Sequence, residues 1–265
     1  MKSLADFPKD TARAVDAVFT DIDDTLTTDG RLPAASYQAL EDLSLAGISI
    51  IPVTGRPAGW CDMIARFWPV SGVIGENGAF YYSYDPRSRE MRRAFAGSTE
   101  TRRKNQRRLG QIRDRVLAEV PGAAISADQA FRDTDLAIDF CEDVPPLKSG
   151  DVQRIKAIFE EAGAVAKVSS IHVNGWFGAH DKHSMTARFC REILGFELAD
   201  NLSRSVFVGD SPNDSPMFAA FPLACGVANL KDFAGQMDAT PAFVSNACGG
   251  AGFVEIARTL LDARR

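Results

Sequence analysis

The residues best suited to chemistry are carboxylates, which occur in two short runs far apart in the sequence. The first run is Asp21-Ile22-Asp23-Asp24-Thr25, and the second is Gly209-Asp210-Ser211-Pro212-Asn213-Asp214. Carboxylates that lie together repel one another unless a cation neutralises them. Mg²⁺ prefers carboxylate oxygens, completed by water and phosphate oxygens. The two runs therefore predict a Mg²⁺ site, provided that the fold brings them together.

Each run follows a short apolar segment that predicts a β-strand. Ala17–Thr20 precedes the first run, residues 205–208 precede the second, and residues 48–53 lead into Thr54-Gly55-Arg56. Amphipathic segments separate these strands, which is typical of βαβ units in a parallel sheet. Ligands bind beyond the carboxyl ends of such strands. The polar groups should therefore meet at one edge of the sheet, together with Lys182 at the head of a helix that returns to it.

The parallel pattern is interrupted in the middle of the chain. A long helix is expected over residues 99–119 and another from Ser149, which could cap it. Short strands are expected near residues 124–126, 136–140, 164–168 and 171–177. We therefore predict an α/β fold: a Rossmann-like doubly wound parallel sheet core of residues 1–83 and 182–265, with an inserted α+β domain of residues 84–181.

Length and composition are those of an ordinary globular protein. The chain has 265 residues, an apolar fraction of 45% and a net charge of −5, which does not favour a nucleic-acid binder. No segment approaches the ~18 consecutive apolar residues of a membrane helix, and the first residues do not resemble a secretion signal. The five cysteines are scattered, without a CxxC pair. We therefore expect a cytoplasmic protein with neither a membrane nor a nucleic-acid partner.

Taken in order, these motifs resemble those of the haloacid dehalogenase (HAD) superfamily of phosphohydrolases, in particular its Cof-like members with a type-IIB cap. The DxDxT motif is the run from Asp21 to Thr25, the second motif is Thr54, the third is Lys182, and the GDxxND motif begins at Gly209. Each motif alone is weak, but four in order, each after a predicted strand or at the start of a helix, are specific. The resemblance covers nearly the whole chain and makes the inserted domain a cap.

The resemblance also implies a two-step phosphoryl transfer and the residues that perform it. Asp21 would be the nucleophile that forms an aspartyl phosphate, and Asp23 would protonate the leaving oxygen and then activate water. Thr54 would bind the transferring phosphoryl group, and Lys182 would neutralise its charge. The other assignments are Asp21, Asp23 (through its backbone carbonyl), Asp210 and Asp214 for Mg²⁺, and Gly55, Arg56, Ser211 and Asn213 for phosphate binding and support.

Substrate choice in relatives with such a cap depends on cap side chains. His172, Asn174 and Trp176 alternate along a predicted strand and so share one face, and Arg132 is a further candidate. These polar and aromatic groups would suit a sugar. The alternative is that Trp176 packs in the cap core and the others are solvated.

The sequence alone does not assign a role to four further features. Asp24 and His183 stand where relatives often have glycine, and Asp214 could also cap the helix that follows it. The sequence Glu76-Asn77-Gly78 recurs in the subgroup, and its simplest role is a turn.

We expect a Mg²⁺-dependent phosphatase that acts on a small phosphorylated metabolite, most simply a sugar phosphate. A phosphomutase on the same scaffold is the first alternative. A non-catalytic nucleic-acid binder is the second, because Arg102-Arg103-Lys104 and Arg107-Arg108 form a basic cluster. Such a cluster is more typical of the solvated face of a helix.

Overall fold

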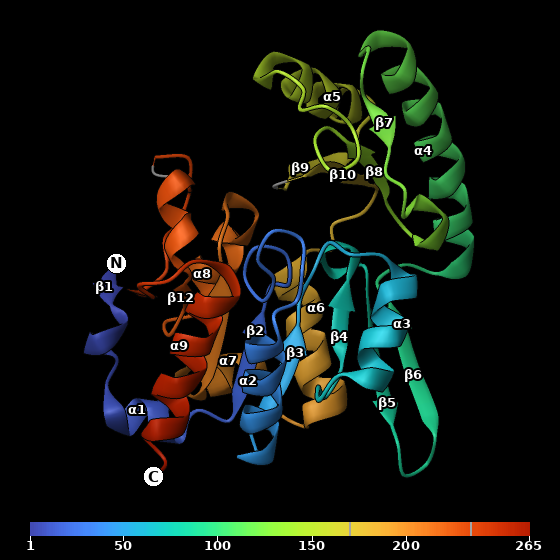
Figure 1. Cartoon of the computed structure of the whole chain (residues 1–265). Helices are drawn as coiled ribbons and strands as arrows, with labels where there is room; N and C mark the ends of the chain where they lie inside the picture. Colours follow the sequence, from blue (N-terminus) through green and yellow to red (C-terminus); the bar gives the residue numbers. More distant parts are fainter. Residues whose placement is uncertain (170, 234) are drawn as a thin grey trace.

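A six-stranded parallel sheet forms the centre of the structure, a computed structural model that describes residues 1–169, 171–233 and 235–265 (Figure 1). Its strands lie in the order β1 (Lys2–Ser3), β13 (Phe243–Val244), β12 (Cys225–Gly226), β11 (Ser205–Gly209), β2 (Ala17–Thr20) and β3 (Ser49–Pro52). Neighbouring strands pair in parallel throughout, with Phe19 opposite Phe207 and Phe19 also opposite Ile51. The predicted parallel core is confirmed. Pro52 ends β3, as its missing N–H group suggests.

Helices cover both faces of this sheet, because the central strands are apolar on both sides. Val18 and Val206 point to one face, where they pack against α2 (Ala34–Leu45), α3 (Ala58–Phe67) and α9 (Gly249–Asp262). Phe19 and Phe207 point to the other face, against α6 (Lys182–Phe189) and α8 (Ser215–Ala220). Burial of each such phenylalanine stabilises the fold by about 1.5–3 kcal/mol. The short helices α1 (Lys9–Ala14) and α7 (Leu198–Asn201) complete the layers.

An antiparallel hairpin extends the core beside β3. It consists of β5 (Phe80–Asp85) and β6 (Glu90–Phe95), and β5 pairs with β4 (Val73–Gly75), which a bridge between Val53 and Ile74 joins to the parallel sheet. Phe80, Tyr82 and Phe95 pack with the apolar core of the larger domain. The expected domain boundary at residue 84 therefore falls inside β5, and the packing places the hairpin with the core. Sequence analysis missed this hairpin because Arg93 lies between Met91 and Phe95 on the face of β6 that packs on the core, which interrupts the alternation of apolar and polar residues.

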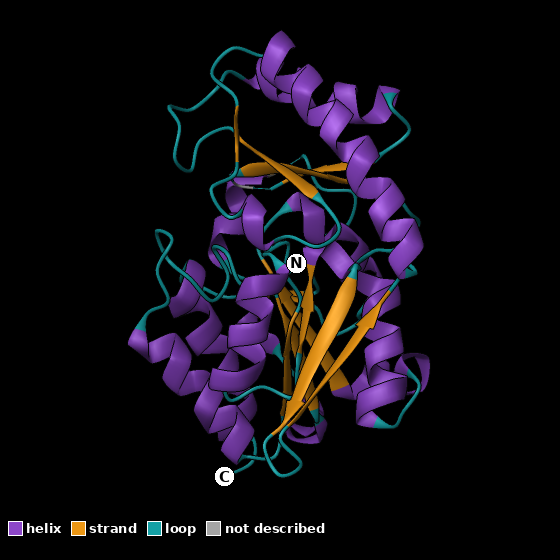
Figure 2. Cartoon of the chain, turned by 90° about the vertical axis from the view of Figure 1, so that its right-hand side faces the viewer, coloured by secondary structure: helices purple, strands orange, loops and turns teal. Residues whose placement is uncertain are grey.

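The cap is a four-stranded antiparallel sheet covered by two helices. The sheet has the order β7 (Ala124–Ile125), β8 (Leu136–Asp139), β10 (His172–Trp176) and β9 (Val165–Val168). The helices α4 (Thr99–Glu119) and α5 (Ser149–Glu161) lie on the side of this sheet away from the core (Figure 2). Leu109, Ile112 and Val116 of α4 are buried there, as their spacing predicts. The predicted inserted α+β domain is confirmed.

Details of the helix ends differ from the sequence expectations. Ser149 is the first residue of α5 rather than its cap, and Lys148 precedes it without a side-chain capping bond. Asp214 precedes α8, but its carboxylate makes no capping bond because it is turned toward the active site. None of the helices in the described part of the chain is both long and apolar enough to cross a bilayer.

Candidate active site

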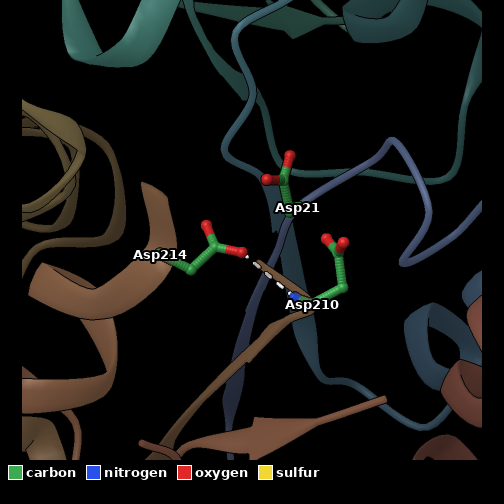
Figure 3. A group of neighbouring side chains, drawn as sticks. All are labelled: Asp21, Asp210 and Asp214. Atoms are coloured by element: carbon green, nitrogen blue, oxygen red, sulfur yellow. Dashed lines mark hydrogen bonds between the residues drawn. The ribbon is translucent and has the colours of Figure 1, made fainter. Parts of the chain in front are cut away.

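Three buried carboxylates meet at the carboxyl-terminal edge of the parallel sheet (Figure 3). Asp21 follows β2, Asp210 follows β11, and Asp214 comes from the turn before α8. Each offers one oxygen, and these oxygens lie within 4.8 Å of one another. The Asp210 backbone N–H donates to Asp214 Oδ2 at 3.1 Å. A Cβ at position 209 would collide with that same oxygen, which explains the glycine of the Gly209-Asp210 pair.

Lys182 joins two of these carboxylates. Its Nζ lies 2.7 Å from Asp21 Oδ2 and 2.7 Å from Asp214 Oδ1, in buried surroundings. Lys182 is the first residue of α6, and Asp181 and Ser184 form a capping box that fixes the start of this helix. The helix end also abuts Gly78, where a Cβ would overlap the Asp181 carbonyl. Glycine at position 78 therefore permits the approach that delivers Lys182.

The electrostatics of the three carboxylates favour a bound cation. Burial raises the pKa of Asp21 to about 6; Lys182 opposes this shift, and Asp214 adds to it. Burial, followed by Asp214 and Asp21, raises the pKa of Asp210 well above its ordinary value. One lysine does not offset three buried carboxylates in their ionised forms, so a bound cation would stabilise those forms. An all-oxygen donor set of this kind fits a hard divalent cation such as Mg²⁺.

All three carboxylates accept hydrogen bonds on both of their oxygens. Both oxygens of Asp214 are engaged, one by Lys182 and one by the Asp210 backbone. Asp210 accepts hydrogen bonds from Thr25 Oγ1 at 2.9 Å and Asn229 Nδ2 at 3.4 Å, which orient its carboxylate. Asp21 likewise accepts hydrogen bonds from the Ile22 backbone N–H on Oδ1 and from Lys182 on Oδ2, so protein donors orient all three carboxylates around the position that a cation would take.

Asp23 lies apart from this group, because its side chain pairs with Arg56. The Arg56 Nη2 to Asp23 Oδ1 distance is 2.8 Å, and Nε lies 3.1 and 3.0 Å from the two carboxylate oxygens. The same guanidinium reaches the cap, where Nη2 lies 3.2 Å from Glu142 Oε1 and Nη1 lies 3.7 Å from Asp128 Oδ2. The expected Mg²⁺ group thus includes Asp21, Asp210 and Asp214, but the Asp23 carboxylate is not in it.

A cavity of about 30 Å³ lies between the cap and these carboxylates. It brings together most of the residues named from the sequence: Asp21, Asp23, Gly55, Arg56, Arg132, His172, Asn174, Asp210, Ser211 and Asn213. Four lining residues were not foreseen: Asn77, Lys167, Ser169 and Ile171. Lys167 and Ser169 lie on β9 and just after it, on the same face as Asn174 and His172, so strand pairing within the cap was the missing signal.

Other predicted residues lie outside this lining. Thr54 is fully buried, and its Oγ1 accepts a hydrogen bond from the Arg56 backbone at 3.0 Å. Trp176 is 2% exposed and stacks on His180, with the ring centroids 5.7 Å apart. His183 is half-buried and does not border the cavity. Asp24 has a φ of 54°, the left-handed conformation that glycine adopts most readily.

Arg132 lines the cavity, but its guanidinium is already occupied. Its Nε lies 2.8 Å from Asp128 Oδ1, and its Nη1 lies 3.1 Å from Asp135 Oδ2. Nη1 also donates to the Gly55 carbonyl of the core at 2.9 Å. Arg132 therefore ties the cap to the turn after β3.

Glu76 has a role that sequence analysis missed, since the Glu76-Asn77-Gly78 segment was expected to form only a turn. The carboxylate of Glu76 is fully buried and accepts hydrogen bonds from the backbone N–H groups of Ala58 (3.0 Å), Asp133 (2.9 Å) and Thr134 (2.6 Å), as well as from the Thr134 hydroxyl. Residues 133 and 134 belong to the cap, whereas Glu76 and Ala58 belong to the core. Glu76 thus fastens the cap to the core, beside the active site.

We expect Glu76→Gln to lower the free energy of unfolding by about 2–4 kcal/mol. The NH₂ group of the glutamine side chain would have to face backbone N–H donors, so these buried donors would lose their acceptor. Chemical denaturation followed by tryptophan fluorescence measures the loss. Glu41→Gln on the exposed surface of α2 is the matched control and should change stability by no more than about 0.5 kcal/mol. Equal stability of the two variants would contradict this role.

The basic cluster of α4 is partly used within the protein. The Arg102 guanidinium lies 3.7 Å from the centroid of the Phe95 ring, and that of Arg108 lies 3.5 Å from the centroid of Phe177. Arg102 also donates to the Gly97 carbonyl at 3.1 Å. These contacts hold α4 against the segments that connect the cap to the core, so the cluster has a structural role.

Comparisons with known proteins agree with this geometry. Residues 18–94 match the family model of haloacid dehalogenase-like hydrolases. A protein from Thermoplasma acidophilum has 19% sequence identity and a TM-score of 0.67, and the alignment covers 94% of this chain and 99% of that one. No curated protein sequence matches the chain.

Two phosphatases of known structure have the same fold. A sugar phosphatase of HAD subclass IIB has 14% identity and a TM-score of 0.62, with 92% of this chain and 96% of that chain covered. The sucrose-phosphatase of Synechocystis, solved with sucrose and phosphate, has 15% identity and a TM-score of 0.61, with 94% and 98% covered. At these identities the comparison shows a shared fold, including the cap.

Proposed function

We propose that this chain, whose residues 18–94 match the family model of haloacid dehalogenase-like hydrolases, is a Mg²⁺-dependent phosphatase that hydrolyses a small phosphorylated metabolite, most simply a sugar phosphate. The observation that carries the proposal is the contact of Lys182 with both Asp21 and Asp214 beside Asp210. A buried nucleophile, a buried cation and a second carboxylate at one strand edge are the parts that phosphoryl transfer needs.

Asp21 is the nucleophile in this proposal. One carboxylate oxygen attacks phosphorus while the bond from phosphorus to the leaving oxygen breaks, which leaves an aspartyl phosphate. Lys182 holds Asp21 Oδ2 at 2.7 Å and places positive charge where the anionic phosphoryl group arrives. The Ile22 backbone N–H donates to Asp21 Oδ1 at 2.7 Å and fixes the orientation of the carboxylate.

Asp23 acts as acid and then as base. It gives a proton to the leaving oxygen, and in the second step it takes a proton from the water that attacks the aspartyl phosphate. That step releases inorganic phosphate and restores Asp21. Arg56 holds the Asp23 carboxylate at the wall of the cavity, where a leaving group would lie. Since Arg56 also contacts Glu142, this orientation depends on the closed cap.

Mg²⁺ would be held by Asp21 and Asp210, with Asp214 as support, and when bound it offsets the negative charge of the carboxylates and the phosphate. Thr54, Ser211 and Asn213 surround the same strand ends and are proposed to bind the phosphoryl group or support the metal site. Gly55 leaves room for the Asn77 side chain, whose nitrogen would lie 3.2 Å from a Cβ at that position.

We expect the purified protein to release phosphate from para-nitrophenyl phosphate in the presence of Mg²⁺. A chelator should reduce the rate by at least about a hundredfold, and added Mg²⁺ should restore it, because uncompensated carboxylates repel an anionic substrate. Phosphate release over a panel of sugar phosphates then identifies the preferred substrate. Isomerised sugar phosphate in place of free phosphate would establish a phosphomutase instead, and absence of both products would contradict the proposal.

A further inference from the structure

The cap turns one face of its sheet toward the active-site cavity. Val173 of β10 and Ala166 and Val168 of β9 point away from the cavity into the cap core. Lys167 alternates with these residues and lies directly opposite Asn174 in the pairing of the two strands. Lys167 and Asn174 both line the cavity. Lys167 thus stands on the part of the cap that faces the substrate.

Lys167 differs from the other cationic side chains around the cavity in its ion pairs. Each of the others is neutralised by carboxylates: Arg56 by Asp23 and Glu142, Arg132 by Asp128 and Asp135, and Lys182 by Asp21 and Asp214. Within the described residues, Lys167 makes no ion pair with any carboxylate. It therefore presents a positive charge that the protein does not use to hold itself together.

The space around Lys167 indicates what that charge would meet. The cavity above Asp21, at about 30 Å³, holds little beyond the phosphoryl group itself. A groove of about 320 Å³ lies next to it and shares Lys167 and Ser169 as lining residues. Its lining mixes polar and apolar side chains: Gln153 and Lys156 of α5 lie on the cap side, and Phe233, Gln236 and Asp238 lie on the core side. The groove offers space for a leaving group beside the cavity, and Lys167 lies where the two join.

We propose that Lys167 binds a second anionic group of the substrate, a carboxylate or a second phosphate, carried by the leaving group. This inference rests on the proposed phosphatase function and narrows its substrate class to phosphorylated hydroxy acids, sugar acids or sugar bisphosphates. An ammonium group in a part-enclosed site binds an anion through charge-assisted hydrogen bonds. The amides of Asn174 and Gln153 suit the hydroxyl groups of such a leaving group.

The test compares matched substrates that differ in one charge. The first pair is glycerate 3-phosphate and glycerol 3-phosphate, which differ by a carboxylate. The second pair is fructose 1,6-bisphosphate and fructose 6-phosphate, which differ by a second phosphate. We expect Lys167→Gln to lower the ratio of kcat/KM within the preferred pair by 10- to 100-fold. Lys104→Gln removes the same charge from the exposed surface of α4 and should leave both ratios unchanged. The pair that responds identifies the anion.

A binding measurement separates this inference from the proposed function. Calorimetry with the Asp21→Asn protein, which should bind these compounds without turning them over, gives the ratio of Kd values within each pair, with and without Lys167→Gln. A ratio that depends on Lys167 supports the inference even if the wild-type protein releases no phosphate. An equal loss of affinity for both members of each pair would place Lys167 on the transferring phosphate, and unchanged Kd values would leave it without a role in recognition; either result overturns the proposal.

Discussion

Asp21→Asn should abolish phosphate release, with a loss in kcat of at least about a thousandfold. The amide cannot form the bond to phosphorus, and it also removes one of the two carboxylates that hold Lys182. The residual rate on para-nitrophenyl phosphate, measured with saturating Mg²⁺, gives the size of the effect. Incubation of the wild-type protein with substrate, followed by an acid quench and mass spectrometry, should also reveal a phosphorylated peptide that contains Asp21.

Asp24→Asn is the matched control for this variant. It makes the same chemical change three positions along the chain, and Asp24 does not line the cavity. Asparagine also tolerates the left-handed conformation of this residue, whose φ is 54°. Asp24→Asn should therefore keep its activity within a few-fold of the wild type. Near-normal turnover by Asp21→Asn would refute the aspartyl-phosphate mechanism.

Asp23→Asn should slow the hydrolysis of alkyl phosphates such as sugar phosphates by about 10²–10⁴-fold, because a poor leaving group needs a proton from Asp23. An aryl phosphate needs no such proton in the first step, but the second step still lacks its base. With para-nitrophenyl phosphate, the variant should therefore release a burst of para-nitrophenol equal to the enzyme concentration, followed by a slow steady state. Rapid-mixing absorbance measurements detect the burst.

The comparison of leaving groups distinguishes acid–base catalysis from a loss of structure. If Asp23 served only to hold Arg56, the aryl and alkyl substrates would lose rate by the same factor and no burst would appear. That contact is substantial, since Arg56 makes hydrogen bonds to both oxygens of Asp23. Asp23→Asn keeps one hydrogen-bond acceptor for Arg56, so the position of the guanidinium should change little.

The local sequence pattern was sufficient to predict the strands and helices that position the candidate active site. Apolar segments ending at Asp21, Val53 and Gly209 predict strands, and in a parallel sheet the carboxyl ends of strands lie at one edge. The positions of β2, β3 and β11, and the helix α4 over Thr99–Glu119, agree with these expectations. The hairpin of β5 and β6 was not predicted, because polar residues on β6 obscure the alternation of apolar and polar side chains.

Only the tertiary structure decided how these residues are paired. Lys182 meets Asp21 from 161 positions away, and Arg56 reaches Glu142 across 86 positions. The first contact depends on how α6 returns to the edge of the parallel sheet, and the second depends on how the cap docks on the core; no local periodicity encodes either. The same docking buries Glu76 among backbone donors of the cap and occupies Arg132 with carboxylates, so a residue expected in a turn holds the domains together.

The sequence by itself was sufficient to predict the chemistry, because the types and order of the residues at the strand ends are those expected of a phosphoryl-transfer site. The tertiary structure determined which contacts each of these residues makes within that site. Asp214 is turned toward Lys182, Asp23 is held by Arg56, and Lys167 faces the cavity without a carboxylate partner among the described residues. The physical reason is that charge pairing and burial depend on residues far apart in the chain, which come together only in the folded structure.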